Sequence, residues 1–524
     1  MREAAIETQV ARGNRPVWIL TLALPDGRML RYGSRALTLA TDAGEPITYE
    51  PLLLAVEDFA EELDLFALDG SLSLAQSAVE IATPDDLASL QSDWAHIPHA
   101  VAELALVWQG QTWERRRTVL GGALVQGAAL GQDGEATTLT LEAAAAATSA
   151  PIGDDDRDLG DDWPPPLLDD TGIDVMTDVT GAKHVWVVGK PESIPAFKVG
   201  NVGGQNRLVL CGHALPDLGA VPVYVEGVLV ASFTPAVATT VNGTYTYVQS
   251  AAHFHSADGS YTWSATSGGI ARADAGNAAT RTAADILGWC LQHSGLRVDW
   301  RRMQRALLKL ASWPAGLWVD QETPAIDVIR DRMVPFLPII EVDSGEGIYF
   351  EYIDPHVQDV GPDLVVGQEL IGRAGRMRAT DTDAVRNRFV MAFQRDESAG
   401  TYASTVLVDH GNSALCYLSQ QLLSRPEVRD DGVRADESIE CDLFWDATTA
   451  RRSLLCRASR LALPRRVLDY VAAPDAYWLE AGGVHRLTDD ARGISGARVA
   501  VTALSRISTG VRVECVDRTP SGAL

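Results

Sequence analysis

The amino-acid sequence predicts a mainly β fold with short helices (α+β), divided into several domains. Its 524 residues correspond to about three or four domains of the usual size. Apolar and polar residues alternate with a period of two in the run Val17, Ile19, Thr21 and Ala23, which predicts a half-buried strand. Similar short runs, separated by glycine-rich turns, recur along most of the chain. Because hydrophobic residues make up 46% and charged residues 22%, the chain can bury several cores.

Residues 1–150 are predicted to form one β-rich domain. One short helix is expected within it, over residues 84–93, because Thr83 suits an N-cap and Pro84 suits the first helical position. The strands expected after this helix cover residues 101–108, 112–120 and 136–141.

Residues 151–183 are predicted to be an acidic linker or extended arm. Residues 151–170 contain eight aspartates and three consecutive prolines, a composition that excludes a helix interior and a central strand. Residues 184–275 then have the pattern of a compact, inserted all-β domain of roughly 90 residues. Its strands are expected over residues 184–188, 207–211, 221–233, 241–249 and 261–265.

The second half of the chain is predicted to contain most of the helices. Residues 276–440 are expected to form an α+β domain, with helices over residues 282–294, 301–312 and from Thr323-Pro324 to about Met333. Residues 441–524 are expected to form a helix over 447–463, capped by Asp446 and stopped by Pro464, followed by β-hairpins. These hairpins would complete a second β-rich half, since strands are expected over residues 465–473, 477–488, 497–508 and 510–516. No short internal repeat is visible, although two β-rich halves flank the insertion.

The net charge of −26 is concentrated in two segments. Residues 51–100 contain ten acids and no Lys or Arg, and residues 151–180 contain ten Asp against Arg157 alone. Specific nucleic-acid binding and stable membrane association are therefore not expected, because both need clustered cations. No signal peptide or membrane span is predicted, because the apolar run near the start is short. The six cysteines are far apart and predict scattered buried thiols rather than a metal site.

The sequence yields no catalytic, cofactor-binding or metal-binding residue. The common hydrolase, phosphate-loop and zinc signatures are absent. Weaker groupings favour structural roles: the acidic Asp154, Asp156 and Asp158, the strand-end pair His253 and His255, the loop pair His96 and His99, and the glycine-rich turn 200–204. Six aromatic residues of the insertion suit either ligand stacking or a strand core: Trp186, Tyr224, Tyr245, Tyr247, Tyr261 and Trp263.

Several segments resemble the hub proteins of tailed-bacteriophage tail tips and baseplates. The resemblance covers most of residues 1–180 and 276–524. It rests on these segments, in this order: Tyr49-Glu50-Pro51-Leu52-Leu53, Trp113-Glu114-Arg115-Arg116-Arg117 with Gly121, the helix 446–463, Pro464-Arg465-Arg466-Val467-Leu468-Asp469-Tyr470, Leu487-Thr488-Asp489-Asp490, and Gly493-Ile494-Ser495-Gly496-Ala497-Arg498-Val499.

The resemblance implies a non-enzymatic structural protein of the virion, made in the host bacterial cytoplasm. Such hubs are trimers in which each chain contributes two tail-tube-like β domains, so that three chains make a pseudo-sixfold ring. The expected partners are the tail tube or distal tail protein, a spike or central fibre, and the tape measure protein, with DNA passing through the lumen on ejection. The alternative is a virion adhesin that attaches to the host by recognising surface carbohydrate through residues 184–275.

Overall fold

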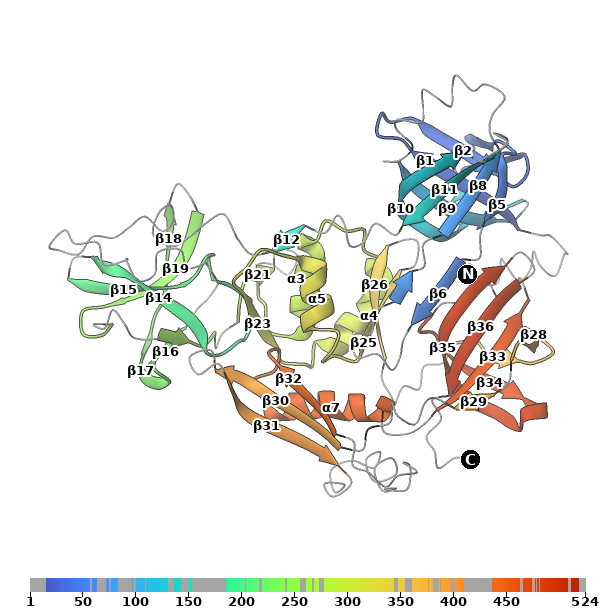
Figure 1. The fold of residues 1–524 in the computed structure, drawn as a ribbon. Coiled ribbons are helices and arrows are strands. Elements are labelled where there is room, and N and C mark those ends of the chain that lie inside the picture. Colours follow the sequence, from blue (N-terminus) through green and yellow to red (C-terminus); the bar gives the residue numbers. More distant parts are fainter. Residues whose placement is uncertain are drawn as a thin grey trace.

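A computed structural model shows that the chain is mainly β, as the sequence predicts. It describes residues 16–517 with gaps, the longest of which are 64–71, 83–96, 143–149, 153–184, 354–360, 380–385 and 410–435. Two β sheets lie at one end of the molecule, short helices lie in the middle, and a further sheet lies at the opposite end (Figure 1). The expected helix 84–93 and nearly all of the expected arm 151–183 fall outside the described residues.

The first sheet, called here the N module, has seven strands in the order β2-β1-β9-β10-β11-β8-β5. One of its faces buries Leu104, Trp108 and Leu139 completely. Where a strand was expected over 112–120, Trp113–Arg115 form a short 3-10 helix and β10 begins at Arg117. The strands are β1 (Val17–Ala23), β2 (Met29–Gly33), β5 (Leu53–Val56), β8 (Ser77–Ala82), β9 (Val101–Val107), β10 (Arg117–Leu130) and β11 (Ala136–Glu142), beside a separate hairpin of β3 (Leu37–Ala40) and β4 (Pro46–Tyr49).

The second sheet, called here the C module, contains strands from both ends of the chain. Its main path is β27-β34-β35-β36-β33-β28, with β29 beside β33. Two strands of residues 1–150 also belong to it, because β6 (Phe59–Leu63) pairs with β35 and β7 (Leu72–Leu74) pairs with β6. The others are β27 (Leu364–Val365), β28 (Leu370–Arg373), β29 (Arg378–Ala379), β33 (Arg466–Ala472), β34 (Val484–Asp489), β35 (Ile494–Ile507) and β36 (Gly510–Asp517).

The two modules repeat one strand order. The series β9-β10-β11-β8-β5 corresponds in order and direction to β34-β35-β36-β33-β28. The central strands β10 and β35 each have 14 residues, and each has a bulge against the next strand, at Gln126 and at Thr502. When these bulges are aligned, Val125 and Val501 are the only identical pair in the two strands. The repeat is therefore structural and is not visible as a sequence repeat.

The helices form close to where the sequence places them. Helix α3 (Ala283–His293) begins at a capping box in which Thr282 and Asp285 bond to each other's backbone, and α7 (Ala447–Leu461) begins at Asp446. Helix α4 (Trp300–Leu310) follows, and α5 (Ala325–Arg332) begins one residue later than expected. The predicted cap of α5 is wrong: Thr323 and Pro324 form the short strand β24, which pairs with β12 (Pro151–Ile152).

The helices pack with two small sheets into one central core. A hairpin of β25 (Ile339–Asp343) and β26 (Ile348–Tyr352) packs against α4. Helix α7 covers the sheet β31-β30-β32, made of β30 (Arg388–Asp396), β31 (Thr401–Asp409) and β32 (Asp436–Cys441). Trp289, Trp313, Phe350 and Phe444 are fully buried in this core. No described helix has the length and apolar character needed to cross a membrane.

The inserted domain is a seven-stranded antiparallel sheet in the order β17-β16-β20-β14-β15-β19-β18. The single strand expected over 221–233 is a hairpin of two strands that turns at Glu226-Gly227, where both φ angles are positive. The strands are β14 (Ile194–Val202), β15 (Gln205–Cys211), β16 (Val221–Val225), β17 (Val228–Phe233), β18 (Ala236–Thr240), β19 (Gly243–Ser250) and β20 (Tyr261–Trp263). A short pair, β21 (Ala271–Arg272) and β22 (Ala278–Ala279), follows before α3.

The inserted domain joins the central core at a place where backbones touch. Strand β13 (Trp186–Gly189) pairs with β23 (Gly316–Val319). A Cβ on Gly316 would lie 2.1 Å from the backbone of both Lys190 and Pro191, and a Cβ on Gly269 would lie 2.5 Å from the Val187 carbonyl oxygen. Only glycine allows this close approach of two chain segments.

We expect Gly316→Ala to lower the free energy of unfolding by about 1–3 kcal/mol, because the added methyl group must push apart two backbone segments. Gly372→Ala is the matched control, since a Cβ there meets nothing within 4 Å. Thermal unfolding of both variants, followed by circular dichroism, checks this. Equal melting temperatures for the two variants would contradict the close approach.

Candidate functional site

The strand β6 physically connects the two modules. It begins three residues after β5 ends, leaves the edge of the N module, and pairs antiparallel with the second half of β35 (Figure 1). The pairing runs from Ala503 opposite Glu62 to Arg506 opposite Phe59. Buried residues of both modules, such as Leu53 and Leu504, belong to one hydrophobic cluster. The modules are therefore packed together as well as linked.

The edge of β10 that corresponds to this β6 site is open among the described residues. In the N module, pairing with β9 ends where Val125 N–H donates to the Ala100 carbonyl oxygen (3.1 Å). In the C module, pairing with β34 ends at the equivalent bond, from Val501 N–H to the Gly483 carbonyl oxygen (2.9 Å). Beyond these points β35 receives β6, whereas no described strand pairs with residues 126–130 of β10 on that side. An unpaired edge of this kind is a template for another strand.

A buried carboxylate holds the C module together at the predicted Leu487-Thr488-Asp489-Asp490 segment. The Asp489 side chain is fully buried and accepts two bonds from Arg373 of β28, one of them 2.8 Å long from Nε. It also accepts a bond from the Tyr470 hydroxyl (3.1 Å), and Arg492 lies 3.7 Å away. The hydrogen bonds from Arg373 lower the pKa of Asp489 below its ordinary value, although burial opposes this. The edge strand β28 is thus tied to β34 across the sheet.

We expect Asp489→Asn to destabilise the protein by about 1–3 kcal/mol at neutral pH, because a buried, hydrogen-bonded charge is lost. A carboxyl with a lowered pKa stabilises the fold above its unfolded-state pKa of about 4, and this contribution is lost as the pH falls through the folded-state value. The difference in urea midpoint between wild type and variant should therefore be constant from pH 7 to about 5 and shrink below about pH 4. A difference that does not change with pH would contradict the ion pair.

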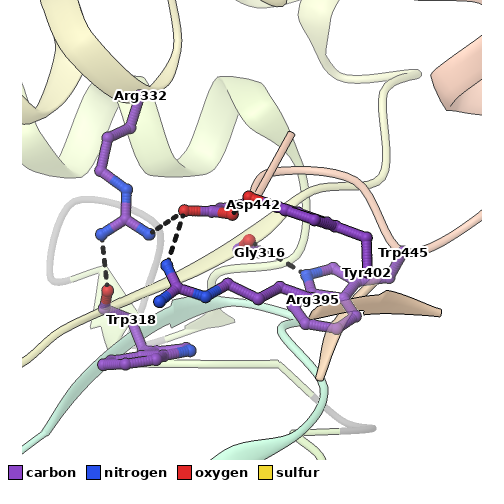
Figure 2. Close-up of polar contacts among 7 residues, drawn as sticks. All are labelled: Gly316, Trp318, Arg332, Arg395, Tyr402, Asp442 and Trp445. Atoms are coloured by element: carbon purple, nitrogen blue, oxygen red, sulfur yellow. Dashed lines mark hydrogen bonds and ion pairs between the residues drawn. The ribbon is translucent and has the colours of Figure 1, made fainter. Parts of the chain in front are cut away.

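A polar cluster at the base of the inserted domain connects four elements of the central core (Figure 2). Asp442, directly after β32, accepts hydrogen bonds from Arg332 of α5 and Arg395 of β30 (both 3.3 Å) and from the Tyr402 hydroxyl of β31 (2.7 Å). Burial and the neighbouring Asp442 raise the pKa of Tyr402. Arg332 also donates to the carbonyl oxygen of Trp318 in β23 (3.0 Å). The cluster links β23, the pairing partner of the strand that leads into the insertion, to helix α5 and to the sheet β31-β30-β32.

A neutral histidine lies at the joint between the inserted domain and the central core, where β13 pairs with β23. Val187 N–H of β13 donates to His213 Nε2 (3.0 Å), and the Trp186 ring packs between the rings of His213 and Trp289. Burial lowers the pKa of His213 to about 4, so the ring is uncharged at neutral pH and can accept this bond. The inserted domain is thereby joined to α3.

We expect the stability of the joint to fall as the pH drops from about 6.5 to 4. The unfolded chain protonates His213 below about pH 6.5, whereas the folded chain does so only near 4, so protons favour unfolding in this range. His213→Gln retains an acceptor without the titration and should flatten this part of the pH profile. Urea unfolding at pH 7 and pH 5, followed by tryptophan fluorescence, measures the slope. Equal slopes for both proteins would contradict the assignment.

The chain is similar to solved structures of phage tail proteins. A scan against protein-family models found no match, and no curated protein matches the chain. Similar structures include a component of the virion of a native gene transfer agent particle (14% identity, TM-score 0.40, 65% of this chain and 85% of that chain). They also include the 43 kDa tail protein of prophage MuSo2 from Shewanella oneidensis (11%, 0.28, 65% and 95%) and a tail protein from Neisseria meningitidis MC58 (9%, 0.28, 64% and 96%).

Two of the groupings weighed in the sequence lie partly within the described residues, and there they have structural roles. The glycine-rich turn 200–204 joins β14 to β15, with Gly204 at φ 78°, as expected for a hairpin. His253 packs edge-on against Phe233, and its carbonyl oxygen accepts from Asn206, so its role in the described structure is a packing one. The other named groups, Asp154, Asp156, Asp158, His96, His99 and His255, lie outside the described residues.

Half of the six aromatic residues named in the insertion are buried in it. Tyr245, Tyr261 and Trp263 are buried, and Trp186 packs at the joint. Tyr224 and Tyr247 are half-buried, and Arg207 lies over the ring of Tyr247. Among the described residues, no group of three or more His, Cys, Asp or Glu side chains could hold a metal ion. Burial raises the pKa of three thiols to about 12, which leaves them protonated and unreactive at neutral pH: Cys211, Cys290 and Cys441.

Proposed function

We propose that the chain is a non-enzymatic structural component of a phage tail tip or baseplate, a trimeric hub whose two β modules form a ring with those of two further copies. The observation that carries the proposal is the strand β6. Within one chain, the second half of β35 pairs with β6, the strand that directly follows the edge strand β5 of the N module. The equivalent edge of β10 is open in the described structure. A second copy that supplies a strand to this edge of β10 would repeat, between two chains, the contact that β6 makes with β35 within one chain.

Repeating a head-to-tail contact generates either a closed ring or an open filament. Six modules, two from each of three chains, would make a closed ring with pseudo-sixfold symmetry. Such a ring fits a sixfold tail tube, or a distal tail protein, on one side and a threefold spike or central fibre on the other. The tape measure protein and then DNA would pass through its lumen. The strongly acidic composition, net charge −26, supports a lumen to which DNA does not adhere.

The proposal places the protein in the virion, after synthesis in the host bacterial cytoplasm. The alternative is host attachment, with residues 184–275 recognising surface carbohydrate. The six aromatic residues named for this role do not support it, because three of them are buried in the sheet core. The close backbone contacts at Gly316 and Gly269 favour a different use for this domain, as a fixed projection from the ring. We therefore propose the hub as the one function.

Mass photometry of the purified chain should show particles of three times 56.3 kDa, and negative-stain class averages should show a ring with a central hole. We expect Ala129→Lys, which places a charge on the exposed part of the open β10 edge, to shift the particles towards single chains.

Thr239→Lys is the matched control, because Thr239 is also exposed on an edge strand, β18 of the inserted sheet. It should leave the assembly intact. A wild-type chain that stays monomeric both alone and on purified tail tubes would overturn the hub, and equal assembly of the two variants would overturn the role of the β10 edge.

A further inference from the structure

Two large apolar side chains occupy equivalent, exposed positions in the two modules. Leu54 of β5 is 56% exposed and Ile371 of β28 is 59% exposed. Each follows a buried leucine, Leu53 (3% exposed) and Leu370 (0%). Each is also the extra residue of a bulge in an edge strand, since the pairing with the neighbouring strand skips it.

Leu54 and Ile371 occupy the same position relative to the paired residues of the neighbouring strand. Leu53 pairs with Ile81 and Ala55 with Glu80, on either side of Leu54. Leu370 pairs with Ala472 and Gly372 with Val471, on either side of Ile371. Alignment of β8 with β33 through their partners β11 and β36 places Ile81 on Ala472 and Glu80 on Val471.

A single exposed leucine would need no explanation. Here the two modules have diverged so far that β10 and β35 share one identical residue, yet both edge strands keep an aliphatic pair at the same place, Leu53-Leu54 and Leu370-Ile371. The first member of each pair is needed for the core. The second contributes nothing to the core, and a bulge turns it outward in both modules. A shared contact outside the chain accounts for both.

That contact is not the one between adjacent modules. The chain passes from β5 to β6 and onto β35, so the C module already lies next to this edge of the N module. Leu54 nevertheless stays 56% exposed. The surface that Leu54 meets therefore belongs to a partner other than the neighbouring module.

We propose that Leu54 and Ile371 are equivalent apolar anchors that insert into one repeated pocket on a homohexameric ring stacked on the hub, the terminal ring of the tail tube. The inference rests on the proposed function and goes beyond it by naming the contact. Two equivalent anchors per chain require a partner that presents the same apolar surface twice per chain. Three chains carry six anchors, which matches six identical pockets and excludes a threefold partner such as a spike.

The test uses the full-length chain and the tail-tube protein of the same particle, purified and assembled into tubes. Leu54→Asp and Ile371→Asp should each weaken co-sedimentation with tubes at least about tenfold, because each places a charge in an apolar pocket in three of six contacts. The two losses should be similar, since the positions are equivalent, and the double variant should lose binding altogether. Both single variants should keep the assembly state of the wild type in mass photometry.

Val228→Asp is the matched control, because Val228 is 69% exposed on the inserted sheet and has no counterpart in the modules. It should bind tubes like the wild type. A photoreactive benzoylphenylalanine placed at position 54 or at position 371 should cross-link to the same peptide of the tube protein, a result that a general loss of solubility would not produce.

Different results would overturn the hub proposal and the anchor proposal. Wild-type chain that forms no ring and binds no tube overturns the hub and the anchors together. A ring that binds tubes equally well with Asp at both positions overturns the anchors alone. A loss at one position only, or cross-links to two different tube peptides, overturns their equivalence and with it the hexameric pocket.

Discussion

The pairing of β6 with β35 is the interaction on which the arrangement of the chain depends. A strand that starts at residue 59 pairs with a sheet whose other strands, apart from β7, all begin at residue 364 or later. The hydrogen bonds of that ladder fix the position of the N module against the C module, and the shared apolar cluster excludes water between them. The central core and the inserted domain are formed by the part of the chain between the N module and the last strands of the C module (Figure 1). Because β6 begins three residues after β5 ends, the N module cannot slide past the C module without breaking the register of β6 on β35.

Local chemistry made much of the fold predictable from the sequence. Thr282 and Asp446 marked the starts of α3 and α7, because an N-cap side chain bonds a backbone group within the first turn of its own helix. Period-two patterns located most strands of the N module and the insertion. The cap of α5 failed for a non-local reason: Thr323 and Pro324 pair with β12, about 170 residues earlier in the chain, and that ladder fixes their backbone.

The module repeat and the outward-facing Leu54 and Ile371 could not be predicted from the sequence, because both depend on pairing between strands that are far apart in the chain. The repeat of the two modules lies in strand order and register, which many sequences satisfy, and only Val125 and Val501 coincide in the long strands. Leu54 follows Leu52 and Leu53 and has the pattern of a core residue, and only the bulge turns it outward. The sequence does contain one relevant similarity, between Leu53-Leu54 and Leu370-Ile371. It indicates a contact surface only once both pairs are known to lie on edge strands. The fold class was therefore predictable from the sequence, whereas the contact surfaces were not.

The close backbone contacts at the base of the inserted domain have a mechanical consequence. Because the backbone fills the Cβ positions of Gly269 and Gly316, and because Asp442 holds Arg332 and Arg395 beside them, this base has little room to pivot. The inserted sheet then behaves as a stiff lever rather than a tethered domain. A force applied at its far tip would act with a long arm on β23 and α5, and so would reach the tryptophan-rich central core as a torque instead of being absorbed at a hinge.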